Sequence, residues 1–171
     1  MVVIIITIII FYNFIDERFI MNKTLEFIKS ILIPVVIGGI VGFLISNFID
    51  YEIINKPPSS PPEIIFPIIW TILYILMGIS YGILKTKNLI DSETNMLYYT
   101  QLLVNVTWPI VFFVFKWRFI SIIWIILLLI LVAYMTIKFY RKNKIAGLLQ
   151  IPYILWTIFA TYLTIGVYIL N

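Results

Sequence analysis

Five long uncharged segments divide the sequence, and they constrain its fold more than any other feature. Each segment is 19 to 27 residues long, and the charged side chains fall between them. An α-helix rises about 1.5 Å per residue and the hydrocarbon core of a bilayer is about 30 Å thick, so about 20 residues cross it. The expected spans cover residues 28–49, 64–84, 96–115, 119–138 and 145–170. Because lipid offers no partner for unpaired backbone groups, the sequence predicts an all-α integral membrane protein with a five-helix transmembrane bundle.

The composition supports this class and excludes several others. Of the 171 residues, 63% are hydrophobic and only 12% are charged, whereas soluble domains are about a quarter charged. The absence of Cys and His excludes disulfides, Cys/His zinc sites and a histidine ligand to haem. We therefore expect no metal site and no required cofactor. The net charge of +4 belongs to the loops, so no nucleic-acid partner is expected.

The N-terminal segment does not fit the pattern of the five spans. "MVVIIITIIIFYNFI" is uncharged but short for a span, and it lacks the basic start and small-residue end of a signal peptide. The preferred interpretation is that residues 1–20 are an apolar extension from an upstream start and that the functional chain begins at Met21. A short interfacial helix is the alternative. Residues 21–171 form the expected membrane domain.

The distribution of Lys and Arg predicts an orientation, because these residues favour the cytoplasmic ends of membrane helices. Nine of the twelve flank the N-terminal end of the first span and the second and fourth connections. They are Arg18, Lys23, Lys29, Lys85, Lys87, Lys138, Arg141, Lys142 and Lys144. The other three are Lys56, Lys116 and Arg118. We expect the Met21 end inside, and the first loop and the C-terminus outside.

Neutral polar and aromatic residues, rather than charges, occupy the spans. No Asp, Glu, Lys, Arg or His lies within the uncharged runs 30–49, 64–84, 94–115, 119–137 and 145–171, which argues against ion pumps, proton-coupled transporters and voltage sensors. Gln101, Asn105 and Trp108 share one face of the third helix at i, i+4 and i+7. An unpaired amide in hydrocarbon costs about 2–7 kcal/mol, so Asn105 must bond either another helix or a ligand.

Aromatic side chains follow helical spacing on two further spans. Trp70 and Tyr74 share a face of the second helix, and Trp156 and Ala160 share a face of the fifth. Trp70 lies close to the end of its span, where an interfacial role explains it equally well. Trp108 and Trp156 lie near mid-span, so they indicate a packed core or an aromatic-lined pocket.

Glycine and proline add two expectations about the helices. Gly38 and Gly42 form a GxxxG pattern on the first span, which we assign to packing within the bundle rather than to a dimer face. Pro109 lies deep in the third span and is expected to bend it, because proline removes a backbone donor.

Several of these segments resemble the signature of the TspO/translocator protein family, the tryptophan-rich sensory proteins. "KPPSSPPEIIFPIIWTILYILMGIS" is similar to its first loop and second helix, and "QLLVNVTWPIVFF" to its third helix. "AGLLQIPYILWTIFATYLTIGVYILN" is similar to its fifth helix, which has the longest and most specific pattern. The resemblance covers roughly residues 28–171 in order.

The resemblance implies a homodimeric five-helix bundle of the bacterial cell membrane that binds porphyrins such as protoporphyrin IX. The implied role is a receptor acting in tetrapyrrole sensing or transport and in stress responses. One alternative is light-dependent degradation of protoporphyrin, with Trp70 and Trp156 as candidate redox residues. A second alternative is a membrane stress or scaffold protein without a dedicated ligand. The candidate ligand-binding residues are Tyr51, Lys56, Trp70, Tyr74, Gln101, Asn105, Trp108, Trp156 and Ala160.

The proline-rich stretch "NKPPSSPPEIIFPIIW", residues 55–70, leads into the second helix. Each proline fixes its own φ and restricts the residue before it, so this loop is stiff. It is either a preorganised lid over a ligand, with Lys56 meeting a porphyrin propionate, or simply a short rigid crossover.

The sequence departs from the family pattern at three positions and at its C-terminal end. Ser59 and Asp50 stand where many members have tryptophan, which removes aromatic surface from the loop, and Thr164 stands where asparagine is usual. No Lys or Arg follows Tyr168, so the cholesterol pattern proposed for animal members is absent and sterol transport is not supported.

Overall fold

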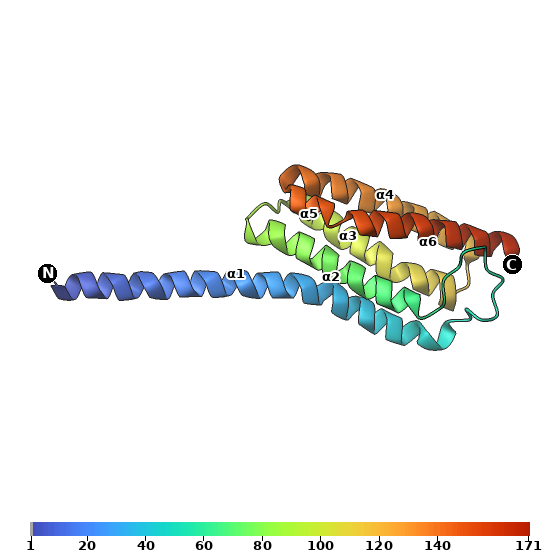
Figure 1. Cartoon of the computed structure of the whole chain (residues 1–171), viewed down its shortest axis with the longest axis horizontal. Helices are drawn as coiled ribbons and strands as arrows, with labels where there is room; N and C mark the ends of the chain where they lie inside the picture. Colours follow the sequence, from blue (N-terminus) through green and yellow to red (C-terminus); the bar gives the residue numbers. More distant parts are fainter. Residues whose placement is uncertain (1) are drawn as a thin grey trace.

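The chain folds into a bundle of long, roughly antiparallel helices (Figure 1). This computed structural model describes the backbone of residues 2–171 and the side chains of residues 20–171. The helices are α1 (Val2–Ile45), α2 (Ile65–Thr86), α3 (Ser92–Pro109), α4 (Arg118–Lys142), α5 (Lys144–Leu148) and α6 (Ile151–Leu170). Two short turns, η1 (Ser46–Phe48) and η2 (Ile110–Val114), follow α1 and α3.

Five segments are long and apolar enough to cross a membrane in the part of the chain that the structure describes. They are Ile20–Phe48, Ile65–Thr86, Ser92–Val114, Arg118–Lys142 and Lys144–Leu170. The expected five-helix membrane bundle is therefore confirmed. The fifth segment consists of two helices, because the chain turns at Leu149 and Gln150 between α5 and α6.

Helix α4 packs against α3, α5 and α6, whereas α1 packs along α2. Five of its apolar side chains recur at intervals of three or four residues and have no exposed surface. They are Ile125, Leu128, Val132, Met135 and Phe139. This spacing places them on one face of the helix, which forms the interior of the bundle.

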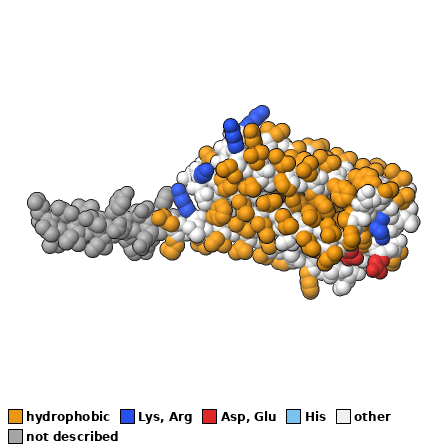
Figure 2. Space-filling model, in the orientation of Figure 1, with side chains coloured by type: hydrophobic (Ala, Val, Ile, Leu, Met, Phe, Trp, Pro, Cys, Tyr) orange, Lys and Arg blue, Asp and Glu red, His pale blue; other side chains and the backbone are white. Residues whose placement is uncertain are grey.

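The outer surface of the bundle is apolar as well. Large hydrophobic side chains such as Phe43, Leu103, Ile130 and Leu155 are more than half exposed, and orange apolar atoms cover most of the visible face in Figure 2. An apolar surface of this extent indicates contact with lipid rather than water.

Helix α1 extends well beyond the other helices at its N-terminal end (Figure 1). A helix of 44 residues is about 66 Å long at 1.5 Å per residue, roughly twice the thickness of the hydrocarbon core. The side chains of residues 1–19 lie outside the described part, so both interpretations of the N-terminal extension stay predictions.

Small residues set the closest approach of α1 and α2. A Cβ atom on Gly78 would lie 2.5 Å from the Cα of Ile31 and 2.6 Å from the backbone oxygen of Ser30, so only glycine permits this contact. On α1, a Cβ on Gly38 would overlap the ring of Tyr74, whereas one on Gly42 would meet nothing within 4 Å. The expected packing role therefore holds for Gly38, and Gly42 faces open space. The homodimer stays a prediction.

The third span departs from α-helical geometry directly after Pro109, where the sequence led us to expect a bend. Turn η2 is a π-helical turn, in which the Phe115 N–H donates to the carbonyl of Ile110 at 3.0 Å. The wider turn places the adjacent rings of Phe112 and Phe113 edge to face at 4.8 Å. Such turns are frequently found at functional sites.

Candidate functional site

The chain between α1 and α2 crosses one end of the bundle and is fastened to the C-terminal end of α6. The backbone N–H of Asn55 donates to the side-chain oxygen of Asn171 at 3.1 Å, and the Asn171 amide donates back to the Asn55 carbonyl at 3.0 Å. The Tyr162 hydroxyl donates to the Pro58 carbonyl at 2.9 Å. Pro57 packs so closely on Gly166 that a Cβ there would lie 2.5 Å from its Cγ. We call the Asn55–Asn171 and Tyr162–Pro58 contacts the latch.

The other end of this loop is held by charge. The carboxylate of Asp50 lies 2.9 Å from the ammonium of Lys116, between η2 and α4, and 3.5 Å from the guanidinium of Arg118, the first residue of α4. Burial raises the pKa of Asp50, but these two cations outweigh that effect and lower it below its ordinary value. Asp50 therefore anchors the loop to the start of α4 and the residues before it.

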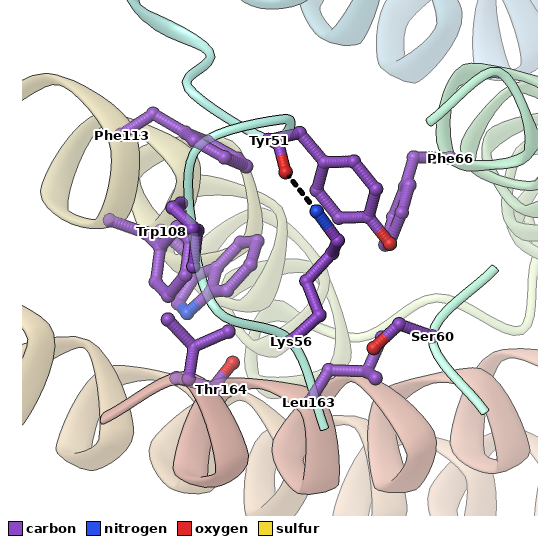
Figure 3. A pocket seen from close by; sticks show the side chains of 11 residues that line it. Tyr51, Lys56, Ser60, Phe66, Trp108, Phe113, Leu163 and Thr164 are labelled. Carbon is purple, nitrogen blue, oxygen red and sulfur yellow. Dashed lines mark hydrogen bonds between the residues drawn. The ribbon is translucent and has the colours of Figure 1, made fainter. Parts of the chain in front are cut away.

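A small cavity of about 40 Å³ lies beneath the loop (Figure 3). Its lining comes from the loop, the start of α2, the α3–η2 region and α6. The lining residues are Tyr51, Ile54, Lys56, Ser60, Phe66, Trp108, Phe112, Phe113, Leu163, Thr164 and Val167. Most of this wall is aromatic or aliphatic, with a single cationic side chain.

Lys56 lies at this cavity, against Tyr51 of the same loop. Its ammonium donates to the Tyr51 carbonyl at 2.5 Å and lies 4.6 Å from the centre of the Tyr51 ring (Figure 3). The Tyr51 hydroxyl donates to the Pro61 carbonyl at 2.5 Å, and burial raises the pKa of this phenol. Lys56 thus has no carboxylate partner in the described part of the chain, and its charge is available to an anion.

Trp108 forms the floor of the cavity. Its ring stacks on Phe112 at 5.1 Å between centroids, and its indole N–H donates to the backbone carbonyl of Ser121 on α4 at 3.2 Å. Because Trp108 and Phe112 are four residues apart, they share one side of the chain. The hydrogen bond to Ser121 and the stacking on Phe112 fix the orientation of the indole ring at the cavity.

The two amides of α3 lie deeper and are satisfied by the protein itself. Asn105 accepts from the Tyr74 hydroxyl at 2.6 Å and donates to the Tyr153 hydroxyl at 2.5 Å. Tyr153 donates in turn to Gln101 at 3.0 Å, and the Gln101 amide lies 2.8 Å from the sulfur of Met77. The sequence left open whether Asn105 bonds another helix or a ligand. In the structure it bonds two other helices, through Tyr74 on α2 and Tyr153 on α6.

The remaining candidate residues surround this network and do not line the cavity. Trp70 packs against Tyr74 and Tyr153 at ring distances of 5.9 and 6.2 Å. Trp156 contacts Phe66 at 5.9 Å, and Phe66 lines the cavity. The indole N–H of Trp156 is buried and has no hydrogen-bond partner within residues 20–171. Ala160 is buried, and its carbonyl accepts from Thr164.

The structure thus brings three of the nine candidates to the cavity: Tyr51, Lys56 and Trp108. It adds Phe66, Phe112 and Phe113, which the analysis of the sequence did not select. A signal for two of them was present, since Phe66 and Phe112 lie four residues from Trp70 and Trp108 on the same helical faces. Phe113 lies in the π-helical turn that follows Pro109, which the sequence did not predict.

The fold and this site together define a class, that of helical membrane proteins with an aromatic-lined cavity beneath a rigid loop at one end. Comparison with known proteins makes the assignment specific. The model of the TspO/MBR family matches residues 30–170, and the chain belongs to this family.

Individual relatives cover most of the chain. Tryptophan-rich protein TspO of Chlorobaculum tepidum is 34% identical over 140 residues, which cover 77% of this chain and 89% of that protein. Tryptophan-rich protein TspO of Archaeoglobus fulgidus is 33% identical over 150 residues, covering 86% and 97%. The Tryptophan-rich sensory protein of Cereibacter sphaeroides is 33% identical over 122 residues, covering 71% and 76%.

Proposed function

We propose that this protein is a membrane receptor for porphyrins and that the cavity beneath the loop is where they bind. The observation that carries the proposal is the composition of this wall: five aromatic rings, those of Tyr51, Phe66, Trp108, Phe112 and Phe113, face a hollow with one cation, Lys56. Flat aromatic ligands are recognised by such rings. A carboxylate on their edge suits the ammonium.

The size of the cavity determines how a ligand reaches it. At about 40 Å³ it is far below the roughly 300–1,000 Å³ of pockets that hold drug-sized ligands. The loop supplies four of the lining residues, Tyr51, Ile54, Lys56 and Ser60. We therefore infer that release of the latch and displacement of the loop create the space for a ligand.

The family supports a role in sensing or moving tetrapyrroles. The names of relatives include a tryptophan-rich sensory protein and a translocator protein of Bos taurus. A bound porphyrin that holds the loop away from α6 would change the shape of this end of the bundle, which is the kind of ligand-dependent change that a receptor requires.

The experiment is a titration of the full chain in detergent micelles with protoporphyrin IX, followed by quenching of tryptophan fluorescence. We expect saturable quenching at micromolar concentrations. Lys56→Gln should weaken binding about threefold to tenfold, as expected for the loss of a charge-assisted hydrogen bond at a partly exposed site. The dimethyl ester of protoporphyrin, which lacks the carboxylates, should bind both proteins equally.

Lys144→Gln is the matched control, because it removes one exposed positive charge at the opposite end of the bundle. Its affinity should equal that of the wild type. Non-saturable quenching that is unchanged by Trp108→Leu would show that porphyrin only partitions into the micelle, and the proposal would be wrong.

A further inference from the structure

The end of the bundle away from the loop carries the positive charge of the described part of the chain. Eight Lys and Arg residues lie there: Lys23, Lys29, Lys85, Lys87, Lys138, Arg141, Lys142 and Lys144. With the three acidic residues Glu26, Asp91 and Glu93, the net charge of this end is +5. The loop end has three cations and three acids. Figure 2 shows the blue side chains gathered beside the grey N-terminal segment.

The acidic residues at this end are already engaged. Asp91 pairs with Lys142 at 2.7 Å, and this contact lowers the pKa of Asp91 well below its usual range. Glu93 pairs with Lys138. Glu26 is shared by two cations, with Lys85 at 2.7 Å and Lys29 at 3.4 Å. One carboxylate between two ammonium groups leaves a positive charge at Lys85 and Lys29.

Lys85 borders an open groove of about 510 Å³ between the end of α2 and the start of α3. The groove is lined by Tyr81, Lys85, Asn88, Ile90, Asn95 and Tyr99. The Tyr81 hydroxyl donates to the side-chain oxygen of Asn95. This bond fixes the Asn95 amide so that its NH₂ group remains as a donor. The groove thus combines an ammonium group, two amides and two tyrosine rings.

The groove lies between the ends of two membrane-spanning segments, and the ends of such segments meet the phosphate groups of a bilayer. The membrane-spanning segments next to it end at Thr86 and begin at Ser92. Tyrosine is enriched at this level of a bilayer, and basic pockets between membrane helices bind anionic head groups. The charged, amide-lined groove is therefore suited to a lipid phosphate rather than to an apolar ligand.

From this arrangement we propose that the groove binds the head group of an anionic phospholipid. Lys85 meets the phosphate, and the amides of Asn88 and Asn95 donate to the phosphate and to the polar groups beyond it. The net positive charge of this end favours an anionic lipid over a zwitterionic one. The porphyrin site lies at the other end of the bundle, so this proposal is independent of the proposed function.

The test is native mass spectrometry of the full chain released from micelles with equal amounts of phosphatidylglycerol and phosphatidylcholine. The wild type should retain phosphatidylglycerol about fivefold over phosphatidylcholine, the preference expected from one basic residue at a lipid surface. Lys85→Gln should abolish this preference. Glu26→Gln should increase it, because that change frees both Lys85 and Lys29 from their shared carboxylate.

Two further variants separate a site from general attraction. Lys144→Gln removes an exposed charge at the same end but outside the groove, and it should leave the preference unchanged. Asn88→Gly removes an amide while suiting the left-handed backbone at this position, where φ is 54°. It should fold normally and reduce the preference.

Three results would overturn the proposal. A loss in Lys144→Gln equal to that in Lys85→Gln would show attraction to the whole end rather than a site. An unchanged preference in both Lys85→Gln and Asn88→Gly would show that the groove does not bind the lipid. Equal retention of phosphatidylglycerol and phosphatidylcholine by the wild type would show that this end does not select anionic lipid.

Discussion

Asn105 shows how one buried amide can join three helices. Its oxygen accepts from Tyr74 on α2, and its nitrogen donates to Tyr153 on α6. The sequence predicted that an amide in hydrocarbon must have a partner. It did not identify Tyr153, because the partner depends on how α3 and α6 are positioned relative to each other.

We expect Asn105→Leu to lower the free energy of unfolding by about 2 kcal/mol, since the Tyr74 hydroxyl would be left buried without an acceptor. The double variant Asn105→Leu with Tyr74→Phe should cost less than the sum of the two single variants. Thermal unfolding in detergent measures this. Thr161→Val is the control, because its hydroxyl bonds only within its own helix, to Thr157. Strictly additive effects would contradict the network.

Asp50 makes the anchoring of the loop dependent on pH. Because Lys116 and Arg118 lower its pKa in the folded protein, the stabilisation is present above its ordinary value of 3.8 and is lost as pH falls through the lower folded value. Asp50→Asn should cost about 1 kcal/mol at neutral pH, and the difference should disappear in acid below pH 3.8. A constant difference at all pH values, measured by thermal unfolding, would exclude the charge explanation.

At the scale of elements, the sequence predicted the five membrane-spanning helices. It predicted one of the two interruptions within them. The five uncharged runs predict the spans because apolar length is what the bilayer requires. Pro109 led us to expect a bend in the third span, and it did not predict the π-helical turn that follows it. The break at Leu149 and Gln150 was not predicted, because both residues lie in a continuous uncharged run.

The sequence predicted that the loop is stiff, but it did not predict that the loop is fastened to the C-terminal end of α6. Its prolines restrict the backbone, whereas the latch joins residues more than a hundred positions apart, such as Tyr162 and Pro58. Such long-range hydrogen bonds leave no periodic pattern in a single sequence. The sequence and its resemblance favoured the lid over the rigid crossover, and the cavity beneath the loop supports the lid.

The latch predicts the rate at which porphyrin binds. Tyr162→Phe removes the hydrogen bond to Pro58, and one hydrogen bond is worth about 1 kcal/mol. The loop should therefore open about fivefold more often. Stopped-flow quenching by protoporphyrin should show association faster by that factor. Tyr140→Phe, at an exposed position on α4, is the control and should have the wild-type rate. An equal rate in Tyr162→Phe would contradict a gating role for the latch.

At the scale of the whole molecule, the two ends differ in charge, with +5 at one end and no net charge at the loop end of residues 20–171. The positive-inside tendency then predicts that the loop faces outward. The natural chain has no cysteine, so single cysteines report topology directly. A membrane-impermeant maleimide applied to intact cells should label Glu52→Cys and leave Lys144→Cys unlabelled. The reverse pattern would invert the orientation.

The sequence predicted the aromatic character of the candidate site, but it did not predict which of the selected residues line the cavity. Spacing and resemblance selected Tyr51, Lys56 and Trp108, which do line the cavity. Gln101 and Asn105 were selected with them, but their polar groups bond within the bundle. A sequence shows that a polar side chain needs a partner, and only the packing of helices determines whether the protein or a ligand provides it.

The central claim is that porphyrin reaches the cavity only when the loop leaves α6. A disulfide between Asn55→Cys and Asn171→Cys would test this, because these residues already contact each other and no other cysteine competes. The oxidised protein should show little or no saturable quenching by protoporphyrin, and reduction should restore it, whereas each single cysteine variant should bind in both conditions. Equal binding by the oxidised and reduced forms would contradict the account.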